Sequence, residues 1–439
     1  MKIIADLHIH SKYSRACSRD LDLENIDRYC QMKGVNVVAT GDFTHPAWFK
    51  ELKNKLIEKE KGLYVLKSKV ESPVYIKASA GRQKLKVKNL EQTRFICATE
   101  ISCIYSKGGK CRRLHIVVLA PNLEVVGKIN QALDKIGNLK ADGRPILGLD
   151  AEELAKICLD IDQRCMIIPA HIWTPWFAMF GSKSGFNSIR ECFGKMSQYI
   201  YAVETGLSSD PQMNWRIKDL DKVSLISNSD AHSLPNIARE SNVFEIKKEE
   251  LNYDKICEVI KKSNPKEFLY TIEFYPEEGM YHIDGHRDCN FSCLPRESKK
   301  NKNICPICKK PLIIGVLNRV EELAEKNRVE NYFDKNRIPF KKLIELDKII
   351  AEVLGIKSRR AKKVQLEYKK LINNLGTEFE ILLEADCKDL NKITLPNIVE
   401  GIRRVREGQL EIVPGFDGQY GQIKIFGKDE IIRKQIKLF

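Results

Sequence analysis

The histidines of this chain are few and unevenly placed, and several of them stand where they could bind metal ions. His8 and His10 form a His-x-His pair at the end of an apolar run, so strand alternation directs both side chains to one face. Asp230 and His232 form an Asp-x-His pair directly after another apolar run. Divalent ions in mixed sites bind neutral imidazoles together with carboxylates that can bridge two ions. We therefore interpret the two pairs as parts of one metal site.

Further titratable residues follow β-like runs between these two pairs, and in a barrel or open sheet of βα units the carboxyl ends of the strands lie on one ligand-binding face. Glu204 ends one such run and is expected to converge on the same face. The predicted metal ligands are His8, His10, Asp42, Glu100, His115, His171, Asp230 and His232. A cluster of two or three ions needs about eight to ten ligands. This set therefore favours a multinuclear hydrolytic site over a single structural ion.

The chemistry expected of such a site is attack by water that the ions activate, while the same ions neutralise charge on the substrate. No covalent intermediate is expected, and no Ser or Cys is predicted to be a nucleophile. The catalytic roles are assigned to Glu100, Asp230 and His232.

The elements that must position these residues change in character along the chain. From residue 1 to about 275, short β-like runs alternate with helical patterns, and the chain becomes mainly helical after a cysteine-rich block. We predict a metal-dependent catalytic barrel over residues 1–278, a zinc-binding module over 279–315 and a basic helical DNA-binding region over 316–439. A basic stretch over residues 67–92 is predicted to be an insertion.

Most of the 14 cysteines stand singly in apolar surroundings, as expected of reduced core residues in a cytoplasmic protein. Cys289, Cys293, Cys305 and Cys308 instead lie in one short block, in which the second pair has the CPIC pattern of a zinc knuckle. Four thiolates at this spacing predict a tetrahedral structural zinc site. His286 is the alternative ligand if Cys289 or Cys293 points away.

The net charge of +15 favours a polyanionic partner. Residues 285–439 hold 32 Lys and Arg against 22 Asp and Glu, so +10 of this charge lies in the last third of the chain. Such clusters are also typical of solvated helix faces, but the asymmetry favours nucleic acid. The predicted contacts to the DNA backbone are Lys107, Lys110, Arg112 and Arg113 in a Gly-Gly hairpin, and Arg359, Arg360, Lys362 and Lys363 in the helical region.

Several motifs occur in the order found in the polymerase and histidinol phosphatase (PHP) superfamily, which this chain resembles: ADLHIHSKYS, ATGDFTHPAW, ATEIS, RLHIVVLAP, IPAHIWTPW and SNSDAHS. The resemblance implies a distorted (β/α)7 barrel with up to three Zn, Mn or Mg ions. It implies one ion bound by His8, His10, Glu100 and Asp230. It implies a second ion bound by His115, His171 and a bridging Glu100.

The resemblance is less complete at the third ion, where only Asp42 and His232 match. Many PHP proteins have an acid-histidine pair where this chain has Asp42 and Phe43, and a further ligand where it has Ser14, Arg15 and Ala16. The third ion is therefore expected to bind weakly or to be completed by substrate, and His45 is a conceivable substitute ligand.

Further motifs resemble the endonuclease Q family along essentially the whole chain, among them ETGLSSDPQMNW, EEGMYHIDGHRDC, GVLNRVEELA and PGFDGQYG. The resemblance implies incision of duplex or single-stranded DNA on the 5′ side of uracil, hypoxanthine, xanthine or an abasic site, leaving a 3′-hydroxyl and a 5′-phosphate. It also implies that the damaged nucleotide is flipped out of the stack. The predicted pocket for the damaged base contains Ser208, Asn228, Trp173, Thr174 and Trp176, although the two tryptophans would also suit core packing.

Two other interpretations remain open: a PHP phosphatase acting on a small phosphate ester, and a DNA-binding, helicase-associated protein without catalytic activity. The near-complete ligand set argues against the second, and the basic C-terminal third argues against the first. No apolar stretch reaches the ~18 residues that a membrane span needs, and the N-terminus does not resemble a signal peptide, so a cytoplasmic, nucleoid-associated location is expected. A sliding clamp or a helicase is a conceivable partner that the sequence does not identify.

Overall fold

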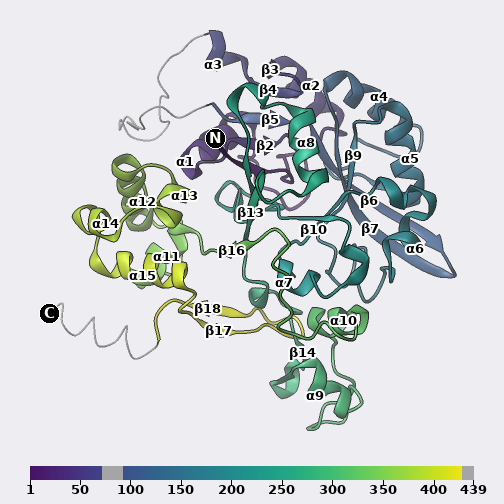
Figure 1. The fold of residues 1–439 in the computed structure, drawn as a ribbon, viewed down its shortest axis with the longest axis vertical. Coiled ribbons are helices and arrows are strands. Elements are labelled where there is room, and N and C mark those ends of the chain that lie inside the picture. Colours follow the sequence, from purple (N-terminus) through teal and green to yellow (C-terminus); the bar gives the residue numbers. More distant parts are fainter. Residues whose placement is uncertain (72–91, 428–439) are drawn as a thin grey trace.

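The computed structural model describes residues 1–71 and 92–427 (Figure 1). It shows an α/β barrel-like body, a small cysteine-containing module and a helical C-terminal region, which confirms the predicted fold class. Most of the predicted insertion at residues 67–92 lies outside the described part, which includes only α3 (Lys67–Glu71) and residue 92 from it. Within residues 1–71 and 92–427, every helix is too short or too polar to cross a lipid bilayer.

The barrel-like body is built around strands from three separate sheets of the described residues. They are β1 (Lys2–Asp6), β2 (Val37–Ala39), β5 (Arg94–Ile96), β6 (Ala98–Lys107), β7 (Lys110–Leu119), β9 (Met166–Pro169), β10 (Ala202–Glu204) and β11 (Ser224–Ile226). The pairs β1–β2, β2–β5 and β10–β11 are parallel, whereas β7 pairs antiparallel with β6 and β9. The segments that follow β1 and β11 are joined where His10 N–H donates to Ala231 O over 3.1 Å and Asp230 N–H donates to His8 O over 2.9 Å.

Further strands extend two of these sheets. They are β3 (Leu56–Glu60), β4 (Leu63–Leu66), β8 (Ile146–Leu147), β12 (Ser241–Glu245), β13 (Phe268–Glu273) and β16 (Phe340–Lys342). The strand β16 pairs in parallel with β13, so the C-terminal region contributes a strand to the sheet of the barrel body.

The helices of the body follow the strands along the chain. They are α1 (Leu23–Lys33), α2 (Pro46–Lys55), α4 (Leu123–Leu133), α5 (Ala151–Ile161), α6 (Ile189–Phe193), α7 (Pro211–Asn214) and α8 (Tyr253–Lys262). Side-chain caps define several of their starts, as at Asp22, whose carboxylate accepts the Asn25 N–H before α1. Apolar side chains of strands and helices join in one continuous core, which holds the strand ends rigidly.

The C-terminal region lies beside the body, on the left in Figure 1. The cysteine module lies at the lower end of the body in the same view. The module and its neighbours comprise β14 (Asp284–His286), β15 (Phe291–Cys293), α9 (Pro295–Lys300) and α10 (Val316–Leu323). The C-terminal helices are α11 (Leu346–Val353), α12 (Lys362–Leu375), α13 (Glu378–Leu383), α14 (Cys387–Ile393) and α15 (Pro396–Glu407), followed by the hairpin β17 (Glu411–Val413) and β18 (Gln422–Lys424).

Buried ion pairs connect the C-terminal helices to the body. Arg359 pairs with Glu345 over 3.1 Å and also bonds to Asn236 of the body. Lys33 of α1 lies 3.8 Å from Glu378 of α13. Because these charged groups are largely removed from water, each depends on its partner to offset the cost of burial.

Candidate metal centre

The structure brings the predicted metal ligands together on the face of the barrel where its strands end. Two groups of side chains have potential ligand atoms within 4.8 Å of one another: one contains His8, His10, Glu100 and Asp230, and the other contains Glu100, His115 and His171. The two groups share Glu100, which is the arrangement that a pair of bridged ions requires.

Each oxygen of Glu100 faces one of the two groups. Its Oε2 atom lies 3.3 Å from His10 Nε2 and 3.7 Å from His8 Nε2. Its Oε1 atom lies 2.8 Å from His115 Nδ1 and 3.1 Å from His171 Nε2. Strand pairing explains part of this geometry, because β6 carries Glu100 and its partner β7 carries His115.

Asp230 completes the first group from the loop that follows β11. Its Oδ1 atom lies 3.0 Å from His10 Nε2 and 3.7 Å from His8 Nε2. The Nε2 atom of His8 is buried and makes no hydrogen bond within the described part of the chain. A buried nitrogen without a partner is costly, and a cation bound between the imidazoles and carboxylates would satisfy it. The residues present therefore fit a divalent ion.

The electrostatics of the two carboxylates and of His115 also suit cation binding. Burial opposes ionisation of Glu100, but His115, Arg144 and His8 nevertheless hold the pKa of its carboxyl well below the usual range. The pKa of Asp230 is likewise lowered against the effect of burial, chiefly by its hydrogen bond with His10. Burial lowers the pKa of His115 to about 4, so this imidazole is neutral at physiological pH. Ionised carboxylates and a neutral imidazole are the forms that bind metal ions.

Glu204, at the end of β10, makes hydrogen bonds that orient two of the predicted ligand residues, His8 and His171. Its Oε2 atom accepts hydrogen bonds from His8 Nδ1 over 2.9 Å and from Asn228 Nδ2 over 3.2 Å, and its Oε1 atom accepts the His171 N–H over 3.3 Å. A carboxylate on the second nitrogen of a ligating imidazole fixes its tautomer and orientation. The sequence predicted that Glu204 would lie at this face but gave it no role, since its contacts depend on residues far away in the chain.

Asp42 and His232, the two predicted ligands of a third ion, are not brought into either group. The Asp42 carboxylate is fully buried and accepts hydrogen bonds from the hydroxyls of Ser11 and Ser14, and it lies 3.0 Å from His10 Nδ1. His232 is half-buried, and its Nδ1 atom bonds to the backbone oxygen of Asp230. In this geometry Asp42 orients His10, because its oxygens are already engaged by protein donors. His45, the conceivable substitute, stacks on Tyr13.

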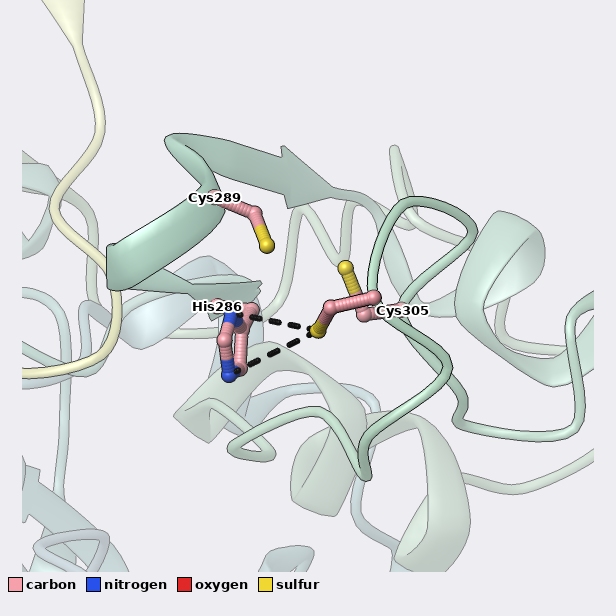
Figure 2. Close-up of side chains that lie close together, drawn as sticks. His286, Cys289 and Cys305 are labelled. Carbon is pink, nitrogen blue, oxygen red and sulfur yellow. Dashed lines mark hydrogen bonds between the residues drawn. The ribbon is translucent and has the colours of Figure 1, made fainter.

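The cysteine module brings together a different set of donors from the predicted four cysteines. Potential ligand atoms of His286, Cys289, Cys305 and Cys308 lie within 4.8 Å of one another, and Figure 2 shows His286, Cys289 and Cys305 pointing toward a common point. Cys293 lies with Cys305 in the small buried core of the module but is not part of this group. Three thiols and one imidazole suit a tetrahedral zinc ion.

The hairpin geometry explains why His286 replaces Cys293. His286 pairs with Phe291 beside the turn that carries Cys289, whereas Cys293 pairs with Asp284, two residues farther along the strands. Two residues of strand span about 7 Å, which takes the Cys293 thiol away from the turn. Burial opposes ionisation of Cys305, but the N–H groups of Cys308 and Ile307 nevertheless lower the pKa of its thiol.

The residues predicted to form a base pocket separate into buried and accessible ones. Trp173 is 1% exposed and donates its indole N–H to Asn214, so it belongs to the core. Asn228 is 0% exposed, and its amide bonds to Leu7 N–H and Glu204. In this structure both residues are thus committed to internal contacts. The members of the set that solvent reaches are Ser208, Thr174 and Trp176, and the last is 43% exposed.

Three of the residues predicted to contact the DNA backbone are engaged inside the protein instead. Lys107 pairs with acidic groups at the start of α5, Arg112 bonds to Gly185 O, and Arg359 pairs with Glu345. Hydrogen bonds that already satisfy these cations leave them poorly suited to bind phosphate. The remaining predicted residues are exposed: Lys110, Arg113, Arg360, Lys362 and Lys363.

Comparison with known structures shows which proteins share the fold of this chain. The crystal structure of the lesion-specific endonuclease PfuEndoQ from Pyrococcus furiosus matches with a TM-score of 0.81 and 27% identity, covering 100% of this chain and 99% of that chain. The chain has the architecture of endonuclease Q. A complex of Endonuclease Q with a 27-mer duplex carrying an abasic lesion at the active site matches with a TM-score of 0.80 and 28% identity over 99% and 98% of the two chains. The predicted resemblance to endonuclease Q is confirmed.

Sequence relatives are also known. The MJ0043 C-terminal domain family matches residues 345–409, which include α11 to α15. The uncharacterized protein MJ0043 of Methanocaldococcus jannaschii is 34% identical over 256 residues, which are 57% of this chain and 31% of that protein. The uncharacterized protein YqxK of Bacillus subtilis is 26% identical over 315 residues, covering 71% of this chain and 74% of that protein. The matched region thus spans about a third of the M. jannaschii relative.

Proposed function

We propose that this protein is a metal-dependent, lesion-specific DNA endonuclease of the endonuclease Q type. The observation that carries the proposal is Glu100, whose two oxygens face two separate ligand groups in a chain that matches endonuclease Q from end to end. The finer proposal is hydrolysis of the phosphodiester on the 5′ side of a deaminated base or an abasic site, leaving a 3′-hydroxyl and a 5′-phosphate.

The ligand groups define what the chain itself contributes. Divalent ions bound there would neutralise charge at the scissile phosphate and lower the pKa of the attacking water. Glu204 and Asp42 hold the His8 and His10 imidazoles through their Nδ1 atoms, so that both Nε2 atoms face the centre. His115 stays neutral because it is buried. Rigid support of this kind keeps the ligands within the narrow geometric limits that metal catalysis requires.

The accessible residues near His171 suit the recognition of an unstacked nucleotide. Thr174 and Trp176 stand three and five residues after His171, and Thr174 Oγ1 lies 3.4 Å from His171 Nδ1. An exposed indole face can stack on any base, which suits an enzyme that accepts several lesions. We therefore assign base contacts to Ser208, Thr174 and Trp176, and backbone contacts to the exposed cations of the β6–β7 hairpin and of α12.

The test is incision of a duplex that contains a single deoxyuridine, deoxyinosine or abasic site, with an undamaged duplex as control. We expect metal-dependent nicking of the damaged strand, and loss of nicking when EDTA removes the ions. Equal cutting of damaged and undamaged duplexes, or no cutting of either, would refute the proposal. Hydrolysis of a small phosphate monoester without DNA cleavage would favour the phosphatase interpretation.

Asp230→Asn separates catalysis from binding. This change should reduce incision at least about a hundredfold, because it removes a charged oxygen that lies between the two imidazoles of the first group. Affinity for DNA should stay within about threefold, since a ligand carboxylate does not attract phosphate. Asp254→Asn is the matched control, because Asp254 pairs with Lys61 on the outside of α8. A large loss of DNA affinity in Asp230→Asn with normal folding would contradict this division of roles.

A further inference from the structure

The Arg144 side chain lies at the edge of the first ligand group. Its Nη1 atom donates to Glu100 Oε2 over 3.0 Å, and this is the oxygen that also faces His8 and His10. The Arg144 side chain is 26% exposed, whereas that of Glu100 is 0% exposed. The guanidinium is therefore partly accessible to solvent, while the carboxylate that it contacts is not.

The backbone of the loop around Arg144 is fastened to the first loop of the barrel. Gly143 N–H donates to Tyr13 O over 3.0 Å, and Arg15 N–H donates to Asp142 Oδ1 over 3.2 Å. A Cβ atom on Gly143 would lie 2.5 Å from Asp42 Oδ2, so the loop reaches this close only because the residue is glycine. The position of Arg144 is thus fixed by contacts that do not involve Glu100.

This loop occupies the region where the sequence predicted a third ion. Asp42 lies in contact with the loop and is already engaged by serine hydroxyls, and Arg144 brings a permanent positive charge beside Glu100. An arginine stays protonated at all physiological pH values, and its planar fork presents several N–H donors. Within residues 1–71 and 92–427, the Arg144 guanidinium makes one hydrogen bond, to Glu100, so its other N–H groups remain available.

We propose that the Arg144 guanidinium is an anion-binding site at the edge of the metal centre, and that it binds a non-bridging oxygen of the phosphate to be cleaved. The part concerning the scissile phosphate rests on the proposed function. Charge-assisted bonds from guanidinium to phosphate are strong and geometrically specific. A fixed cation aimed at this group stabilises the charge that develops during hydrolysis. Arg144 thereby supplies the positive charge that a third ion supplies in a three-ion centre.

The first experiment measures binding of inorganic phosphate to the metal-loaded protein by isothermal titration calorimetry. Arg144→Gln should weaken phosphate binding at least about tenfold, as expected for loss of a hydrogen bond to a charged group. Lys140→Gln is the matched control, since Lys140 lies four residues before Arg144 with an exposed side chain and its loss removes the same charge. This control should change phosphate affinity by less than about threefold.

The second experiment measures metal content and incision in the same variants. Arg144→Gln should keep the same ions per chain as the wild type, and it should lower kcat for a deoxyuridine duplex about 10²- to 10³-fold with a smaller change in KM. Arg144→Lys should recover part of kcat, because it restores the charge without the fork.

Three results would overturn the proposal: undetectable phosphate binding by the wild type, equal loss of phosphate affinity in the two Gln variants, or loss of ions in Arg144→Gln. The last result would mean that Arg144 only supports the ligands. If the wild type binds phosphate through Arg144 but does not cut damaged DNA, the proposed function fails while the anion site stands.

Discussion

Replacing Glu204 with glutamine removes a charge behind the metal centre without changing the ligands themselves. The two oxygens of Glu204 accept three hydrogen bonds, from His171 N–H on one side and from His8 Nδ1 and Asn228 Nδ2 on the other. A glutamine side chain has a single oxygen and an NH₂ group that cannot accept. At least one buried donor must then face this NH₂ group.

The expected magnitude follows from two separate considerations. A buried donor without an acceptor costs about 1–3 kcal/mol. Loss of the partner on the second nitrogen of a ligating imidazole typically weakens ion binding about 10- to 100-fold, which corresponds to about 1.4–2.7 kcal/mol. The cost of the unpaired donor and the loss of ion affinity are thus of similar size. We therefore expect Glu204→Gln to weaken binding of the ion at His8 by about 10- to 100-fold.

Competition with a chromophoric chelator at pH 7 measures this affinity, and circular dichroism verifies the fold. Glu273→Gln is the matched control, because Glu273 is equally buried and its oxygens bond to Ser227 and Thr271 rather than to a ligand. Burial raises the pKa of Glu273 to about 7, so the neutral amide should be tolerated there. Ion affinity that is unchanged in Glu204→Gln, or equally weakened in both variants, would refute the assigned role of Glu204.

Three further predictions concern stability, the cysteine module and the base pocket. Although burial opposes it, the cations Lys348, Arg359 and Lys33 lower the pKa of Glu345 to about 2, so its stabilising contribution is present above pH ~4.5 and is lost as the pH falls toward 2. Glu345→Gln should therefore lower the free energy of unfolding by about 3 kcal/mol at pH 7 in urea titrations, and a difference that persists unchanged at pH 2.5 would contradict this. His286→Ser should reduce bound zinc by about one equivalent per chain in mass spectrometry while Cys293→Ser retains it, and the opposite result would restore the four-cysteine site. Trp173→Ala should destabilise the fold by about 3–5 kcal/mol. Trp176→Ala should leave the melting temperature unchanged and weaken binding to a lesion-containing duplex by about 1–3 kcal/mol. Equal melting temperatures in the two variants would contradict the buried position of Trp173.

The convergence of the ligands could be predicted from the sequence because it depends on a regular feature of the fold. Residues at the carboxyl ends of neighbouring strands must lie at one face, whatever their distance along the chain. Glu100 and His115 lie inside strands instead, and the register of the antiparallel β6–β7 hairpin brings their side chains together. These positions are determined by strand pairing, which apolar runs and turn residues indicate.

The environment of each side chain could not be predicted in the same way. Asn228 and Trp173 stand in motifs that suggest a pocket, but their burial depends on packing against Leu7 and Asn214 from other parts of the chain. The choice of His286 over Cys293 depends on the register of a three-residue hairpin. Arg144 lies in a loop without periodicity, and contacts with residues far away in the chain, among them Tyr13 and Arg15, bring it to Glu100. Spacing along the sequence carries no signal for contacts of this kind.

Three residues of the metal centre have backbone conformations that are unfavourable for residues other than glycine. Asp42, His171 and Asp230 have φ values of +46°, +29° and +46°. Aspartate adopts the left-handed region with modest cost, but a histidine there is unusual and costs about 1–3 kcal/mol. Gly206 accommodates this conformation, because a Cβ atom at that position would lie 2.4 Å from His171 Cβ. The Glu204 carboxylate then holds the His171 N–H. All of these contacts are made within the protein, so folding itself contributes to the orientation of His171.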